Sequence, residues 1–139
     1  MDLLTTEEYA ALAANLDLPT GAFIDGGYRS AVSGRSFVSH NPATGEVIGK
    51  IASCDVADVN LAVEKAREAF EDGRWAGLHP RERKDTLIRL SKLMTRNARE
   101  LAVMESIDSG KPIFDCETVD IPESINCIKW HGETCDKLY

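Results

Sequence analysis

The sequence lacks a long hydrophobic run and an early positive charge, and each absence excludes a class of protein. No apolar run approaches the roughly 18 residues that a membrane-spanning helix needs. The first Lys or Arg is Arg29, so the amino terminus has no positively charged n-region of the kind that opens a secretory signal. The sequence therefore predicts a cytoplasmic protein with no membrane partner.

An excess of basic residues is also lacking. The 139 residues hold 16 Lys and Arg against 23 Asp and Glu, which gives a net charge of -7. Nucleic-acid binding needs clustered basic residues, so this balance argues against a nucleic-acid partner. With 43% hydrophobic and 28% charged residues, the composition is that of an ordinary globular domain.

Cysteines are too few and too unevenly spaced for a small disulfide scaffold. The four are Cys54, Cys116, Cys127 and Cys135. In an acidic chain without a secretory signal, this pattern predicts reduced thiols.

Glycine-rich phosphate-binding motifs are absent as well. No Gly-x-Gly-x-x-Gly occurs, so the chain carries no dinucleotide fingerprint. The stretch from Gly45 to Lys50 is not a phosphate-binding loop, because its glycines are one residue too close and Ile51 stands where Ser or Thr should hold magnesium.

The elements that are present come in the order β, then α. A capping signature at Thr5 to Glu8 predicts a first short helix over 6–16. The pair Asp25 and Gly26 predicts the two-residue turn of a hairpin over 23–28, and β-rich runs predict a second strand pair at 36–40 and 46–52. Helical periodicity then predicts four helices, over about 55–73, 80–95, 96–108 and 119–138, with Asp55 as the N-cap of the first.

This order leaves the helices without a sheet to cover. Their apolar stripes would pack well on a large sheet, but the chain lacks the long Val- and Ile-rich strands of one. The pattern predicts helices that cover a surface the chain does not contain.

One cluster has residue types that bind metal. Cys127, His131 and Cys135 recur every four residues on a predicted helix, and two neighbours among them would suit zinc. The alternative interpretation is packed thiols beside a surface histidine, because one straight helix rarely supplies three tetrahedral ligands. No cysteine has a base oriented by a third group, so no catalytic residue is predicted in this chain.

Four blocks resemble the NAD(P)-dependent aldehyde dehydrogenase family in order and spacing. They are FIDGGY at 23–28, FVSHNPATGEVIGKI at 37–51, AVEKAREAF at 62–70 and ESIDSGKP at 105–112. DIP at 120–122 and IKW at 128–130 are similar to the branch that oxidises ω-amino and γ-glutamyl-amino aldehydes.

The resemblance implies an α/β fold of which this chain is only part. Residues 1–139 would form the amino-terminal part of the cofactor-binding domain, a bit under the first third of the family's length. The hairpins and amphipathic helices would flank a Rossmann-like sheet that follows. The catalytic, cofactor-binding and oligomerisation residues would also lie downstream, so no cofactor-binding residue is expected here.

The resemblance also assigns supporting residues. Ser39, His40 and Asp108 correspond to positions where many members hold a structural monovalent cation, K⁺ or Na⁺. Val119 and Glu123 fall on the helix that lines the aldehyde tunnel. A carboxylate at Glu123 would favour a cationic substrate amine; the alternative is a rim carboxylate that faces water.

Two functions follow. The first is an oxidoreductase that, as a full-length homodimer or homotetramer, oxidises an aldehyde to the acid with NAD or NADP; this chain alone would be inactive. The second is a non-catalytic truncated fragment or association module, which would expose apolar surface.

Overall fold

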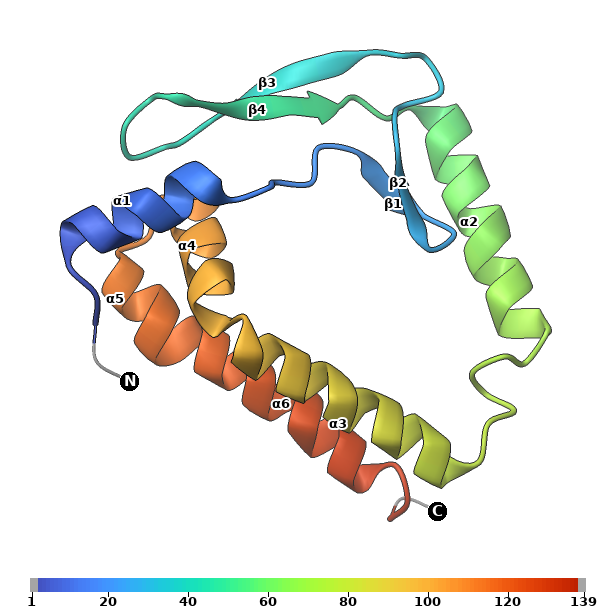
Figure 1. The fold of residues 1–139 in the computed structure, drawn as a ribbon. Coiled ribbons are helices and arrows are strands. Elements are labelled where there is room, and N and C mark those ends of the chain that lie inside the picture. The colour runs from blue at the N-terminus through green and yellow to red at the C-terminus, as the bar shows by residue number, and fades with distance from the viewer. Residues whose placement is uncertain (1–2, 138–139) are drawn as a thin grey trace. The chain divides into compact units, whose positions relative to one another are not determined.

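The computed structural model describes residues 3–137, which divide between two compact units. Among these residues, the hairpin unit comprises Asp17–Asn41 and Gly45–Leu78, and the helical unit comprises 3–16, 42–44 and 79–137. The mixed α/β class predicted from the sequence is confirmed, since small antiparallel hairpins are followed by helices (Figure 1).

Two antiparallel hairpins open the hairpin unit. Their strands are β1 (Ala22–Ile24), β2 (Gly27–Arg29), β3 (Ser36–His40) and β4 (Val47–Ala52). Asp25 and Gly26 join β1 to β2 with φ of 56° and 75°, the left-handed conformation that a tight two-residue turn needs. Both hairpins lie where the sequence predicts them.

A buried carboxylate fixes the start of α2 (Val56–Glu71) in the same unit. Asp58 is 2% exposed and accepts hydrogen bonds from the backbone N–H groups of Asp55, at 2.9 Å, and Val32, at 2.8 Å. These N–H groups lower the pKa of Asp58, because they stabilise its charged form. Asp55 caps the helix through the N–H of Ala57, as predicted.

The helical unit begins with α1 (Thr6–Asn15), which is closed by the predicted capping box of Thr5 and Glu8. It continues with α3 (Pro80–Arg96) and α4 (Ala98–Ser109). The chain then passes through α5 (Ile113–Asp115), the π-helical segment η1 (Cys116–Asp120) and α6 (Ile121–Thr134).

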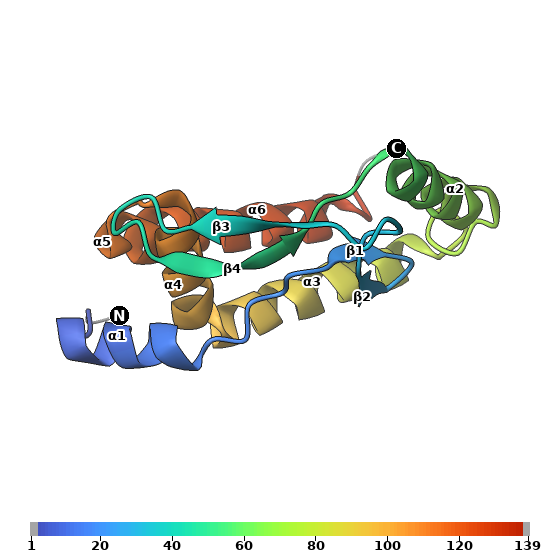
Figure 2. The same cartoon turned by 90° about the horizontal axis from the view of Figure 1, so that it is seen from above.

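α3 and α6 pack side by side and antiparallel (Figures 1 and 2). Lys84 near the start of α3 pairs with Asp136, just beyond the end of α6, at 2.9 Å. A Cβ at Gly132 would lie 3.1 Å from Cβ of Leu87 and 3.2 Å from Cδ1 of Ile88. The absence of a side chain at Gly132 therefore lets the two helices approach closely.

The predicted last helix is confirmed as α6, which starts at Ile121, two residues after the predicted Val119, and ends at Thr134. α5 and the π turn of η1, which directly precede α6, were not predicted. The N–H of Ile121 bonds the carbonyl of Cys116, five residues earlier. Pro122 has no N–H to continue the usual ladder, so the widened turn falls directly before it.

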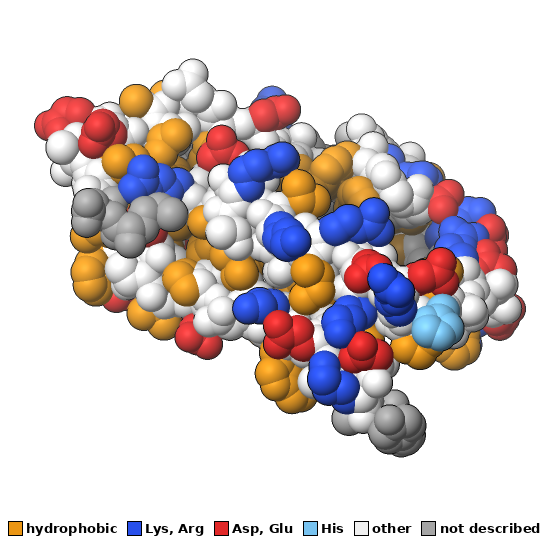
Figure 3. All heavy atoms as spheres, turned by 60° about the horizontal axis from the view of Figure 1, so that its bottom comes forward, with side chains coloured by type: hydrophobic (Ala, Val, Ile, Leu, Met, Phe, Trp, Pro, Cys, Tyr) orange, Lys and Arg blue, Asp and Glu red, His pale blue; other side chains and the backbone are white. Residues whose placement is uncertain are grey.

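Few hydrophobic residues are buried in the part of the chain that the structure describes. They are Ile24, Ala31, Ala102, Val103 and Cys116. Along α2, by contrast, Val56 is 74%, Val63 60% and Phe70 70% exposed. Hydrophobic side chains also surface among the charged ones in Figure 3. The prediction of apolar stripes left uncovered in this chain is confirmed.

Across residues 3–137, no helix is both long and apolar enough to cross a membrane.

Candidate functional site

The two predicted tunnel residues lie where η1 passes into α6. Val119 is 51% exposed, and Glu123 is exposed in the first turn of α6. Their spacing of four residues places them close to one face of the helical path. Within residues 3–137, the Glu123 carboxylate makes no hydrogen bond or ion pair.

Behind this exposed face, the same segment buries two side chains. Cys116 is 0% exposed and burial raises the pKa of its thiol. The Glu117 side chain is 5% exposed. The π turn therefore presents Val119 outward while its first two residues anchor it inward.

Glu117 has partners on two other helices. The hydroxyl of Tyr9 on α1 donates to its Oε2, and Arg99 Nε on α4 donates to its Oε1 at 3.4 Å. Burial, and then the hydrogen bond to Glu117, raise the pKa of Tyr9. Sequence reasoning missed this cluster, because no local pattern connects Tyr9 with a residue 108 positions later.

The predicted cation ligands fall in both units. Ser39 is half-buried and His40 exposed at the end of β3, where the pairing with β4 is irregular. His40 Nδ1 lies 3.1 Å from the carbonyl oxygen of Gly45. Asp108 is exposed in the last turn of α4, in the helical unit. A monovalent-cation site at these three residues stays a prediction.

In the cysteine–histidine cluster on α6, the side chains of His131 and Cys135 lie within hydrogen-bond distance of backbone carbonyl groups of the same helix. His131 Nδ1 lies 2.8 Å from the carbonyl oxygen of Cys127 and 3.6 Å from its Sγ. The Cys135 thiol donates to the carbonyl of His131 at 3.3 Å. Among residues 3–137, no group of three or more His, Cys, Asp or Glu is placed to hold a metal ion. Cys127 and His131 are exposed and Cys135 is half-buried, so the prediction of packed thiols is wrong for Cys127, whereas the histidine lies at the surface as predicted.

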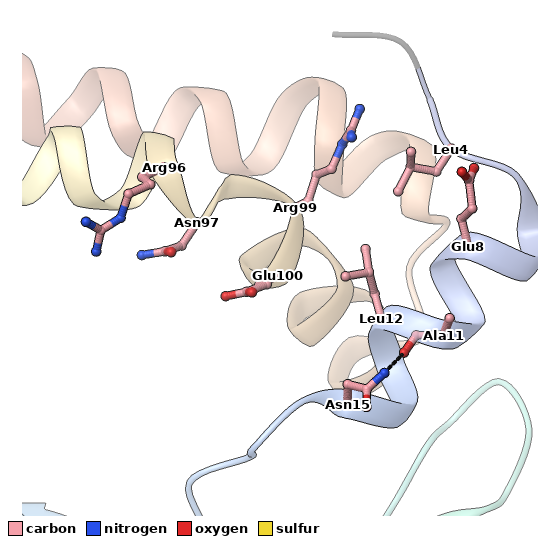
Figure 4. Close-up of a pocket in the computed structure, with 9 residues that line it drawn as sticks. All are labelled: Leu4, Glu8, Ala11, Leu12, Asn15, Arg96, Asn97, Arg99 and Glu100. Atoms are coloured by element: carbon pink, nitrogen blue, oxygen red, sulfur yellow. Dashed lines mark hydrogen bonds between the residues drawn. The ribbon is translucent and has the colours of Figure 1, made fainter.

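An open pocket of about 440 Å³ lies in the helical unit (Figure 4). Leu4, Glu8 and Leu12 line it from the amino-terminal side, and Arg96 and Glu100 from the junction of α3 and α4. Sequence reasoning missed it, because it forms only when α1 packs near α4. Its lining mixes both charges and defines no ligand.

Comparison with known proteins decides the family. The model of the aldehyde dehydrogenase family matches residues 28–139 of this chain. The chain belongs to the aldehyde dehydrogenase family. The resemblance read from the four sequence blocks is therefore confirmed.

Aldehyde dehydrogenases with different named substrates are similar to this chain. The aminoacetaldehyde dehydrogenase of Pseudomonas aeruginosa is 58% identical over 138 residues, which cover 99% of this chain and 28% of that protein. The solved indole-3-acetaldehyde dehydrogenase of P. syringae, in complex with NAD⁺, is 46% identical with a TM-score of 0.95; the match covers 99% of this chain and 28% of that one.

A third relative is the solved γ-glutamyl-γ-aminobutyraldehyde dehydrogenase of Burkholderia cenocepacia. It is 46% identical with a TM-score of 0.94, over 97% of this chain and 27% of that one. The chain thus spans under a third of the length of these aldehyde dehydrogenases. The TM-scores show that this segment has the same fold as the matching segment of these solved aldehyde dehydrogenases.

Proposed function

We propose that these 139 residues are the amino-terminal part of an NAD(P)-dependent aldehyde dehydrogenase that oxidises an aldehyde bearing a terminal amino group. The observation that carries the proposal is the 58% identity to an aminoacetaldehyde dehydrogenase along 99% of the chain. The unpartnered carboxylate of Glu123 supports the substrate class, since it would pair with an ammonium group.

The cofactor has no place among these residues. The sequence holds neither a Gly-x-Gly-x-x-Gly nor a phosphate-binding loop, so binding of NAD or NADP is assigned to the remainder of the polypeptide. When bound, the nicotinamide accepts a hydride from the substrate. The part of this segment is to bind and orient the aldehyde: Val119 supplies an apolar contact and Glu123 holds the distal amine.

The test is the substitution Glu123→Gln in the full-length protein. Removing the charge should raise the KM for 3-aminopropionaldehyde about tenfold, the equivalent of about 1.4 kcal/mol, and leave that for propionaldehyde unchanged. Glu133→Gln is the matched control, because Glu133 is an exposed carboxylate farther along α6 that pairs with Lys129. An unchanged KM for both aldehydes would show that Glu123 merely faces water, and equal KM changes would show that its charge does not select the amine.

The catalytic part of the proposal has its own test. The 139-residue chain alone should form no NADH with any aldehyde, whereas the full-length protein should form it. Aldehyde-dependent NADH production by the 139-residue chain would contradict the proposal that the catalytic and cofactor-binding residues lie in the remainder of the polypeptide.

We also propose that Ser39, His40 and Asp108 hold K⁺ or Na⁺ through oxygen atoms in the full-length enzyme. Oxygen is the donor that such hard cations prefer. Thermal unfolding of the full-length protein should then occur at a higher temperature in KCl or NaCl than in choline chloride of equal ionic strength. Asp108→Asn should reduce that difference.

The whole enzyme is proposed to be cytoplasmic and to assemble as a homodimer or homotetramer. Light scattering of the purified full-length protein distinguishes these assemblies from a monomer.

A further inference from the structure

The buried carboxylate of Glu117 has no part in the chemistry proposed above. Its side chain is 5% exposed, and it stands in η1 two residues before Val119. Burying an ionised carboxylate is costly unless hydrogen bonds and an opposite charge compensate. A residue retained at such a cost is a candidate for a specific positioning role.

The compensation comes from two helices that are remote in sequence. Tyr9 donates its hydroxyl proton to Oε2 of Glu117, and Arg99 donates from Nε to Oε1. The Tyr9 oxygen also accepts a hydrogen bond from the backbone N–H of Leu4 at 3.2 Å. Both carboxylate oxygens are thus held, one from α1 and one from α4.

These contacts hold the segment that forms the π turn. Its i to i+5 hydrogen bonds are rarer than those of an α-helix, and such turns are typical of functional sites. The N–H of Ile121 bonds the carbonyl of Cys116, so the turn sets how Val119 and the first turn of α6 are rotated about the helix axis. If the turn relaxed, Val119 and Glu123 would change direction together.

We propose that Glu117 is a positioning residue for the substrate: its contacts with Tyr9 and Arg99 fix the π turn that aims Val119 and Glu123 at the aldehyde. This inference rests on the proposed function of that face. Glu117 itself touches no substrate and acts through the turn.

The first test is Tyr9→Phe in the full-length protein, which removes one hydroxyl and keeps the ring. The KM for 3-aminopropionaldehyde should rise about fivefold, because a charge-assisted hydrogen bond holding the turn is lost and the aim of Glu123 degrades. The kcat and the KM for the cofactor should stay near wild type. Tyr28→Phe is the matched control, because Tyr28 is 63% exposed in the other unit.

Arg99→Lys is the second variant, since it keeps the charge but alters the geometry at Oε1. It should raise the KM for the amino aldehyde less than Tyr9→Phe does. An unchanged KM in Tyr9→Phe would overturn the proposal. An equal loss of kcat for every aldehyde, together with a lower unfolding temperature, would also overturn it, because that pattern marks a purely structural contact.

A measurement without turnover separates this inference from the proposed function. Hydrogen exchange of the amides in 116–121 should be faster in Tyr9→Phe than in Tyr28→Phe, whatever the substrate is. If the wild-type protein oxidised no aldehyde but these amides exchanged faster in Tyr9→Phe, the proposed function would be wrong, whereas the stabilisation of the π turn by Glu117 would be supported. Unchanged exchange in Tyr9→Phe would contradict that stabilisation, even in an active aldehyde dehydrogenase.

Discussion

The two units of this chain hold their elements together over different distances along the sequence. In the hairpin unit, β1 meets β2 across a two-residue turn, and the hydrogen bond from Val32 to Asp58 spans 26 positions. In the helical unit, Lys84 reaches Asp136 across 52 positions, and Tyr9 reaches Glu117 across 108. The contacts of the hairpin unit therefore join residues that are closer in sequence than those that join the remote helices of the helical unit.

Among the substitutions that test this contrast, Glu117→Ala has the largest expected effect on stability. The substitution leaves the Tyr9 hydroxyl and Arg99 without their shared acceptor, and should cost about 3 kcal/mol of local stability. Hydrogen exchange in the full-length protein should then be roughly a hundredfold faster for α1 and η1, while β1 and β2 stay unchanged.

Glu133→Ala is the control for that experiment. Its carboxylate and its partner Lys129 are both more than half exposed, so the substitution should cost at most about 0.5 kcal/mol. If Glu117→Ala were as mild as this control, the helical unit would not depend on its long-range contact.

Gly26→Ala is the corresponding test in the hairpin unit. No atom lies within 4 Å of the added Cβ, so the cost comes from the φ of 75° alone and should be about 1 kcal/mol. Exchange should speed up in β1 and β2 and nowhere in the helical unit. Gly27→Ala is matched, because its Cβ also meets open space but its φ is ordinary; a cost equal to that of Gly26→Ala would refute the conformational argument.

The same contrast separates what the sequence could predict from what it could not. The capping box at Thr5, the turn at Asp25 and Gly26, and the cap at Asp55 each depend on neighbours within a few residues, and each was predicted. The four family blocks likewise identified the family.

Tertiary features escaped prediction. The π turn of η1 was not predicted, because a single i to i+5 turn before α6 leaves no signal in the helical periodicity of the sequence. The pocket beside α1 needs two segments about 90 residues apart in sequence to meet. Val119 and Glu123 were predicted only through the family resemblance, because exposed helical residues carry no local signal of a substrate.

The smallest expected effect is the pH dependence of the hairpin unit. Backbone N–H groups lower the pKa of Asp58 in the folded protein, so its contribution to stability is complete above the ordinary pKa of about 3.9 and is lost as the pH falls through the folded-state value. Exchange protection at the start of α2, corrected for intrinsic rates, should therefore decline in acid.

Asp58→Asn should flatten this dependence, because the amide does not titrate. A decline in acid that is as steep in Asp58→Asn as in the wild type would assign the effect to another group.

The most direct test of the whole account is NADH formation by the full-length protein with two aldehydes of similar length, one carrying a terminal ammonium group and one uncharged. The account predicts aldehyde-dependent NADH formation with a higher kcat/KM for the aminated substrate, and loss of that preference in Glu123→Gln. No aldehyde-dependent NADH would contradict the proposed activity, and a preference for the uncharged aldehyde would contradict the role of Glu123.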